Sequence, residues 1–263
     1  MLAKLMKYEF KATSRIFIPL YAVLLVFSIV NRIINPDNLI RSSSNFDIFD
    51  IFAIVGVTLY IGMIIAVVIV TLIIMIQRYY KNLLGDEGYL MFTLPVQSWK
   101  LIISKVITSV TWSILSFLTT IVSLIIIMGT KNLGTDIREI FEFIKTSMGA
   151  AGFVILPLYG LLMLASSIIM IFTAITLGQL FSKHRVIASF GMYCALYMAQ
   201  QLLLSILILS FSFSWFQFII RSTDPTPTQL NKFLIFIIIP GIIMGIVHFI
   251  VTNYIMNRKL NLE

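Results

Sequence analysis

Charged residues are scarce in this chain of 263 residues: Asp, Glu, Lys and Arg make up 11% of it, whereas 59% is hydrophobic. A soluble domain carries about 25% charged residues. Cysteine is almost absent, because Cys194 is the only one, and this excludes an internal disulfide and a cysteine-rich metal site. Cys194 lies inside a long apolar run, where we expect it to serve packing. These shortages exclude an ordinary soluble domain and indicate a membrane protein.

Stretches without any charged residue indicate where the chain crosses the membrane. A helix needs roughly 20 apolar residues to cross the hydrocarbon core, and barrel strands of about 10 residues are far shorter than the runs found here. The six runs are Ile16–Asn31, Ile51–Gln77, Val106–Thr130, Thr146–Ser182, Val186–Ile220 and Phe233–Asn257. We therefore predict an all-α membrane protein, one transmembrane domain over 1–263, with spans at about 16–34, 52–77, 106–128, 153–180, 186–213 and 233–256.

Basic residues are unevenly divided between the two sides that these spans define. The segments before the first span, after the second, after the fourth and after the sixth hold 12 of the 19 Lys and Arg residues, and the three opposite loops hold 7. Cytoplasmic segments of membrane proteins carry the excess of Lys and Arg. Both termini are therefore predicted to be cytoplasmic. The net charge of +8 then reflects topology, not nucleic-acid binding.

The N-terminal residues 1–15 have the pattern of an amphipathic helix. Their basic residues share one helical stripe, and the apolar ones fall on the other side; the basic set is Lys4, Lys7, Lys11 and Arg15. Such a helix is typical of the inner membrane interface, with its basic face toward anionic headgroups. Glu9 breaks the pattern. It is either a carboxylate paired with a nearby lysine or a contact with a cytoplasmic partner.

Small and polar side chains follow helical spacing in three of the spans. Span 3 carries a seam that lets another helix approach closely, made of Ser109, Ser113, Ser116, Thr120 and Ser123. Span 6 has Gly241 and Gly245 directly after Pro240, which predicts a close-packing surface. Span 5 has a bulkier stripe of Tyr193, Tyr197, Gln201 and Ser205, with Gln200 beside it. This stripe either joins helices or faces a polar pathway, because polar groups facing lipid are costly.

Residues that could carry catalysis or ion coupling are missing from the spans. No span core holds Asp, Glu, Lys or Arg, and His248 is the only ionisable candidate, expected to be neutral and hydrogen-bonded. The nearest match to a phosphate-binding loop, between Gly129 and Gly134, lacks the lysine that the motif requires. We therefore predict that the chain is not an enzyme and binds no cofactor, and that a separate polypeptide supplies any energy from nucleotides.

Four stretches of the chain are similar to one known family. They are KYEFKATSRIFIPLY (7–21), RYYKNLLGDEGYLMFTLPV (78–96), SWKLIISKVITSVTW (98–112) and LGQLFSKHRVIASF (177–190). In these the chain resembles the short, six-span permease subunits of ABC-2-type transporters, of the kind found in Firmicutes. The second stretch is the most specific, and the similarity extends from end to end.

The resemblance implies an assembly with several parts in the bacterial plasma membrane. Such permeases are multi-pass proteins that pair as homodimers or heterodimers, and a separate cytoplasmic ATPase, which holds ATP and Mg, docks on each. A coupling helix in the first cytoplasmic loop meets the ATPase, and spans 2 and 5 border the translocation path. Relatives export peptides, lipids or drug-like amphipathic molecules, and some confer resistance to antimicrobial peptides.

Residues 86–93 have the composition of such a coupling helix. Asp86 and Glu87 suit the first turn of a helix because its dipole favours negative charge there, and Pro95 disfavours helix at the residue before it. The residues predicted to contact the ATPase are Asp86, Glu87, Tyr89, Leu90, Met91 and Phe92. A helix resting on lipid is the alternative, although the anionic inner leaflet repels the two acids. Secondary contacts are predicted at Glu9, Lys183, His184 and Arg185, where a purely topological basic loop is the alternative for the last three.

Three function classes are compatible with the sequence. The first is the permease subunit of an ATP-driven exporter, with its substrate path along Tyr193, Tyr197, Gln200, Gln201 and Ser205. The second is a regulatory or immunity protein that binds a peptide or a sensor without transporting it. The third is a stand-alone channel or carrier.

Overall fold

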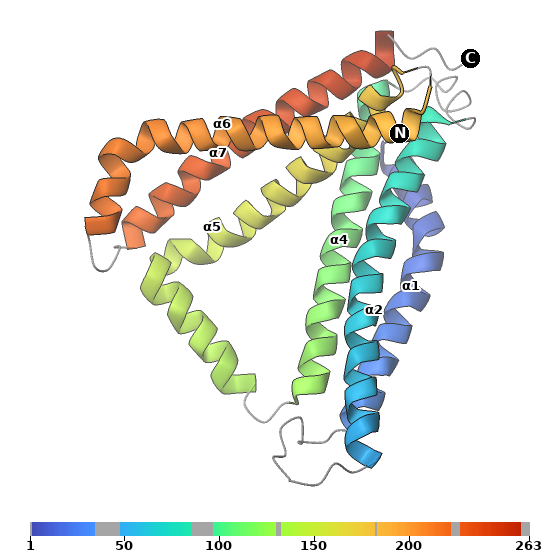
Figure 1. The fold of residues 1–263 in the computed structure, drawn as a ribbon, viewed down its shortest axis with the longest axis vertical. Helices are drawn as coiled ribbons and strands as arrows, with labels where there is room; N and C mark the ends of the chain where they lie inside the picture. The colour runs from blue at the N-terminus through green and yellow to red at the C-terminus, as the bar shows by residue number, and fades with distance from the viewer. Residues whose placement is uncertain are drawn as a thin grey trace. The chain divides into compact units, whose positions relative to one another are not determined.

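The computed structural model describes residues 2–34, 48–85, 97–129, 133–181, 183–221 and 227–258. Within these ranges the regular structure is entirely helical (Figure 1). The elements are α1 (Leu2–Ile34), α2 (Ile48–Tyr79), the π-helical turn η1 (Tyr80–Leu84), α4 (Ser98–Met128), α5 (Leu133–Gly178), α6 (Arg185–Arg221) and α7 (Pro227–Arg258). The described part contains six helices that are long and apolar enough to cross a membrane. The predicted all-α fold with six such helices is confirmed.

The first helix differs from the expected arrangement of an interfacial piece followed by a span. α1 runs without interruption from Leu2 to Ile34, with Pro19 inside it. No glycine or proline stands at the expected junction near Arg15, so nothing in the sequence ends the helix there. The amphipathic pattern itself is present, because Lys4, Lys7, Lys11 and Arg15 are all exposed.

The described chain packs as two compact units. The first comprises Met1–Gln77 and Ile107–Arg138, and the second comprises Arg78–Val106 and Glu139–Glu263. Helices α2, α4 and α5 therefore contribute residues to both units, and α2 and α4 do so around the first loop between them. In the second unit they contribute the C-terminal end of α2 and the N-terminal end of α4, which flank the predicted coupling helix in sequence.

The first unit is held together along the small-residue seam of α4. Ser116 lies 2.7 Å from the Tyr21 hydroxyl of α1 and 2.9 Å from the Thr71 hydroxyl of α2. About two helical turns further along α4, the Ser123 hydroxyl is hydrogen-bonded to the Tyr60 hydroxyl at 2.8 Å. Small side chains allow the helices to approach, and their hydroxyls satisfy one another away from water. The seam therefore serves helix packing, as its spacing predicts.

Trp112 forms the aromatic centre of the first unit. Its ring stacks on Phe17 with 4.5 Å between the ring centroids, and its indole nitrogen donates to the Thr13 hydroxyl at 2.7 Å. Phe10 and Tyr21 contact the same ring. Residues of the amphipathic N-terminal segment are thus packed against α4, and this contact extends the core past the predicted start of the first span.

α5 is bent at Gly149 (Figure 1). Gly149 has a positive φ of 67°, a conformation that only glycine adopts readily. The amide of Asn231 donates to the carbonyl oxygen of Met148 at 2.8 Å, so it satisfies an acceptor that the bend releases. The bend falls shortly before the span expected at 153–180.

α5 and α7 approach closely in the second unit. Ser166 donates to the carbonyl oxygen of Gly241 at 3.2 Å, and Thr173 is hydrogen-bonded to Thr252 at 2.9 Å. A side chain at Gly241 would meet the methyl group of Met163 at 2.8 Å. The Gly241–Gly245 motif therefore provides close packing, as predicted, and its partner is α5.

Replacing Gly178 by alanine is expected to destabilise the junction of α5 and α6. A Cβ atom there would lie 2.6 Å from the backbone nitrogen and the Cα atom of Ser189, and backbone atoms cannot move aside as a side chain can. The cost of such overpacking is about 1–3 kcal/mol. The measurement is the temperature at which the detergent-purified protein loses its monodisperse peak. Gly160→Ala is the control, because nothing lies within 4 Å of its new methyl group; equal melting of both variants would contradict the expectation.

Candidate functional site

The predicted polar stripe lies along one side of α6 and is poorly covered by the chain. Tyr193 and Ser205 are half-buried, whereas Gln201 is exposed and Tyr197 is 54% exposed. The rings of Tyr193 and Tyr197 stack with 6.4 Å between centroids. Within the described residues no side-chain hydrogen bond reaches the two tyrosines or Gln201. Among the described residues the stripe therefore makes no hydrogen-bonded seam of the kind found on α4.

The part of α6 whose side chains are described, residues 185–209, is unusually bare for a helix of this apolar character. None of the residues in its most apolar 18-residue window is buried, whereas 17–28% are buried in the corresponding windows of the other five helices. Cys194 is exposed on this helix, so the packing role expected for it is not found inside the described chain. This helix also carries amide and phenol groups, which are costly to expose to hydrocarbon.

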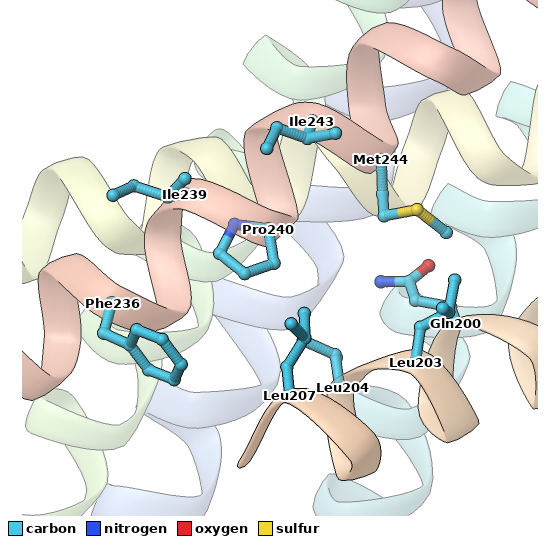
Figure 2. Close-up of a pocket in the computed structure, with 9 residues that line it drawn as sticks. All are labelled: Gln200, Leu203, Leu204, Leu207, Phe236, Ile239, Pro240, Ile243 and Met244. Carbon is cyan, nitrogen blue, oxygen red and sulfur yellow. The ribbon is translucent and has the colours of Figure 1, made fainter. Parts of the chain in front are cut away.

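Gln200 and Gln201 are adjacent in sequence but have different surroundings. Gln200 lines a groove of about 420 Å³ between α6 and α7, and Figure 2 shows its amide turned toward Met244. The other lining residues are Leu203, Leu204, Leu207, Phe236, Ile239, Pro240 and Ile243, together with Met244. Gln200 is thus the single polar side chain of this groove and stands apart from the stripe.

The residues predicted to contact an ATPase through the first cytoplasmic loop lie outside the described part of the chain. They are Asp86, Glu87, Tyr89, Leu90, Met91 and Phe92. The segments on either side are described. On the N-terminal side α2 passes into η1, a π-helical turn that is closed by a hydrogen bond from the Gly85 amide to the Tyr80 carbonyl oxygen at 2.8 Å. Turns of this kind occur frequently at functional sites.

Both flanks of this loop are attached to the C-terminal ends of α5 and α7. The Tyr79 hydroxyl is 2.7 Å from the Thr176 hydroxyl of α5 and 3.8 Å from the sulfur of Met256 in α7. Beyond the loop, the Ser98 hydroxyl at the start of α4 donates to the Asn257 side-chain oxygen at 2.5 Å. The sequence predictions did not single out Tyr79, although it lies in the stretch that carries the family resemblance most specifically.

The four secondary contact residues divide into two kinds. Lys183, His184 and Arg185 are exposed in the connection between α5 and α6, where they are available to a partner or to water. Glu9 is only 8% exposed. The described chain thus covers Glu9 far more than the other three, and both of its interpretations, a carboxylate paired with a nearby lysine and a contact with a cytoplasmic partner, stay predictions.

Two buried ionisable residues differ from their sequence assignments. Lys105, counted among the cytoplasmic topology charges, is buried near the start of α4; its ammonium group lies 3.2 Å from the side-chain oxygen of Asn82 when that amide is oriented to satisfy both of its ends. His248 is buried, and its carbonyl oxygen accepts from Thr173 and Thr252. Its Nδ1 atom, expected to be hydrogen-bonded, has no partner among the described residues.

Across the described ranges no three His, Cys, Asp or Glu side chains converge to hold a metal ion. Comparison of the chain with protein family models, with curated proteins and with solved structures finds no match.

Proposed function

We propose that this chain is the permease subunit of an ATP-driven exporter of the ABC-2 type. Its partners are a separate cytoplasmic ATPase and a second permease chain, identical or homologous, in the bacterial plasma membrane. The substrate is an amphipathic peptide, lipid or drug-like molecule, and export of or resistance to antimicrobial peptides is one such role. The six long apolar helices and the family-like stretches at 7–21, 78–96, 98–112 and 177–190 support this proposal.

The observation that carries the proposal is the bare polar stripe of α6. Tyr197 and Gln201 present hydrogen-bonding groups on a long apolar helix whose apolar 18-residue window contains no residue buried by the described part of the chain. Such groups are costly in hydrocarbon. A second permease chain facing α6, with a polar path between the two, covers them. In a six-helix protein that acts alone, these groups would stay exposed to hydrocarbon at this cost.

The coupling role belongs to residues 86–93 as a short cytoplasmic helix. In this proposal the acids begin the helix and Tyr89, Met91 and Phe92 enter a groove of the ATPase, which holds ATP and Mg and performs all hydrolysis. Both termini are cytoplasmic, so the basic face of residues 1–15 lies at the inner leaflet. Lys183, His184 and Arg185 form a secondary contact on the same side.

The deciding experiment is co-purification of the affinity-tagged chain from its native membrane, followed by identification of the bound proteins and assay of ATP hydrolysis. An ATPase and a permease partner, with hydrolysis stimulated by amphipathic substrates, would support the proposal. A peptide or sensor partner without an ATPase would favour a regulatory or immunity protein. A lone oligomer that conducts without ATP would favour a channel or carrier.

Replacing Gln201 by leucine is expected to change substrate-stimulated ATP hydrolysis several-fold while leaving the complex assembled. Gln201 is exposed and has no hydrogen-bond partner in the described chain, so the substitution removes only what the amide does toward substrate or the second chain. Its loss amounts to about one hydrogen bond, or 0.5–1.5 kcal/mol. Ser167→Leu is the matched control, because Ser167 is also exposed in a span but bonds only to its own helix. Loss of assembly in the Gln201 variant would show that the stripe joins the chains and does not line a path.

A further inference from the structure

The loop between α2 and α4 is attached to the rest of the second unit at both of its ends. We call these attachments the clamp: Tyr79 with Phe172, Thr176 and Met256 on one side, and Ser98 with Asn257 on the other. All six residues belong to the second unit. The clamp joins four helix ends, since Tyr79 ends α2, Ser98 begins α4, and the others lie near the ends of α5 and α7.

Tyr79 is the better-packed half of the clamp. It is 0% exposed, and its ring lies on that of Phe172 with 4.0 Å between centroids and 5° between planes. The hydroxyl bonds to Thr176 at 2.7 Å. Leu83 and Leu84, at the end of η1, are buried as well. A side chain stacked, bonded and enclosed in this way has a single position, so a displacement of η1 must displace α5.

The other half of the clamp is polar. The Ser98 hydroxyl donates to the Asn257 side chain at 2.5 Å, and Asn257 in turn donates to Asn253 at 3.2 Å. Between the two halves, Asn82 and Lys105 join η1 to α4 through the contact at 3.2 Å. The two ends of the loop are thereby held to each other as well as to α5 and α7.

We propose that the clamp makes the loop ends move as one body with the C-terminal ends of α5 and α7, and that Tyr79 is the positioning residue that transmits this motion. This inference rests on the proposed function, because the motion comes from a docked ATPase. It differs from transmission along α2 and α4 alone, the route suggested by chain connectivity. Displacement of the loop then reaches α7, which borders the α6 groove beside Gln200.

The first test is Tyr79→Phe. The phenylalanine keeps the ring on Phe172 and removes the hydrogen bond to Thr176, so the ATPase should still co-purify, whereas substrate stimulation of ATP hydrolysis should fall about fivefold, the factor that corresponds to one hydrogen bond. Tyr80→Phe is the control, since Tyr80 is the neighbouring half-buried tyrosine whose hydroxyl makes no bond within the described chain. Unchanged stimulation in Tyr79→Phe would overturn the role of Tyr79.

The second test joins the other half of the clamp covalently. Ser98→Cys and Asn257→Cys are combined with Cys194→Ser, and the pair is cross-linked in membranes. If the loop and α7 move together, the cross-link should form even when the permease is present without the ATPase. In the complete complex, the cross-linked sample should then hydrolyse ATP and transport as fast as the same sample after reduction. Failure to cross-link, or a cross-link that stops turnover, would overturn the one-body motion. If no ATPase co-purifies with the wild-type chain, the proposed function is wrong, and so is the proposal that Tyr79 transmits motion from an ATPase. The cross-link between positions 98 and 257 should still form in that case, because it depends only on the contact between α4 and α7.

Discussion

Replacing Tyr89 and Phe92 together by alanine is expected to weaken binding of the proposed cytoplasmic ATPase by tens-fold or more. Aromatic anchors enclosed in a partner's pocket each contribute about 2 kcal/mol or more, and about 1.4 kcal/mol corresponds to a factor of ten in affinity. The permease itself should insert normally, because both positions lie in sequence between α2 and α4, outside the predicted spans. The measurement is the amount of ATPase that co-purifies with the tagged double variant, together with transport.

A second pair of aromatics provides the control for that experiment. Phe117 in α4 and Phe143 in α5 are 66% and 70% exposed, and neither belongs to the predicted coupling helix. Their double replacement by alanine removes a similar apolar area from the surface and should leave ATPase binding unchanged. Wild-type binding and transport in the Tyr89 and Phe92 variant would show that residues 86–93 only rest on the membrane.

The parts of the fold that depend on local pattern could be predicted from the sequence. The serine and threonine seam of α4 repeats at helical spacing, and this repetition is sufficient to predict a surface where Tyr21, Tyr60 and Thr71 approach. The motif at Gly241 likewise predicts close packing without naming its partner. In both cases the helix period fixes which side chains share a face, and small size fixes how near a neighbour can come.

The parts that depend on distant contacts could not be predicted. Tyr79 and Lys105 stand at the edges of apolar runs, where a rule based on span length and charge treats them as interfacial. In the folded chain Tyr79 contacts Thr176 and Met256, and Lys105 lies beside Asn82, and span length and charge reveal neither contact. Glu9 is a similar case, because a single charge on an apolar face gives no sign of whether it is covered.

The α6 stripe lies between these two cases. Its spacing correctly places Tyr193, Tyr197, Gln201 and Ser205 along one line, but the period cannot show what faces that line. Adjacent residues on a helix point about 100° apart, so Gln200 enters the groove beside α7 while Gln201 remains exposed. One amide is thus part of the groove between α6 and α7, and the other would face the second permease chain in the proposed complex.

Replacing Trp112 by alanine is expected to have the largest effect on stability of any single change in the first unit. The ring is only 7% exposed, stacks on Phe17 and donates to Thr13, so its removal opens a cavity and leaves a hydroxyl without its donor. Loss of a buried aromatic side chain costs about 3–5 kcal/mol in well-packed proteins. The measurement is the fraction of monodisperse protein that remains after heating in detergent, followed by size-exclusion chromatography.

Two variants separate the contributions that Trp112 makes. Trp112→Phe keeps an aromatic ring against Phe17 but cannot donate to Thr13, so it should lose only about 1 kcal/mol, the worth of a typical hydrogen bond, together with a smaller loss of contact. Trp99→Ala is the matched control, since Trp99 is 40% exposed and its removal opens no cavity in the first unit. If Trp112→Ala were no less stable than Trp99→Ala, the aromatic contact between α1 and α4 would not hold this unit together. The N-terminal segment around Phe10 and Thr13 would then owe its place to the membrane surface and not to α4.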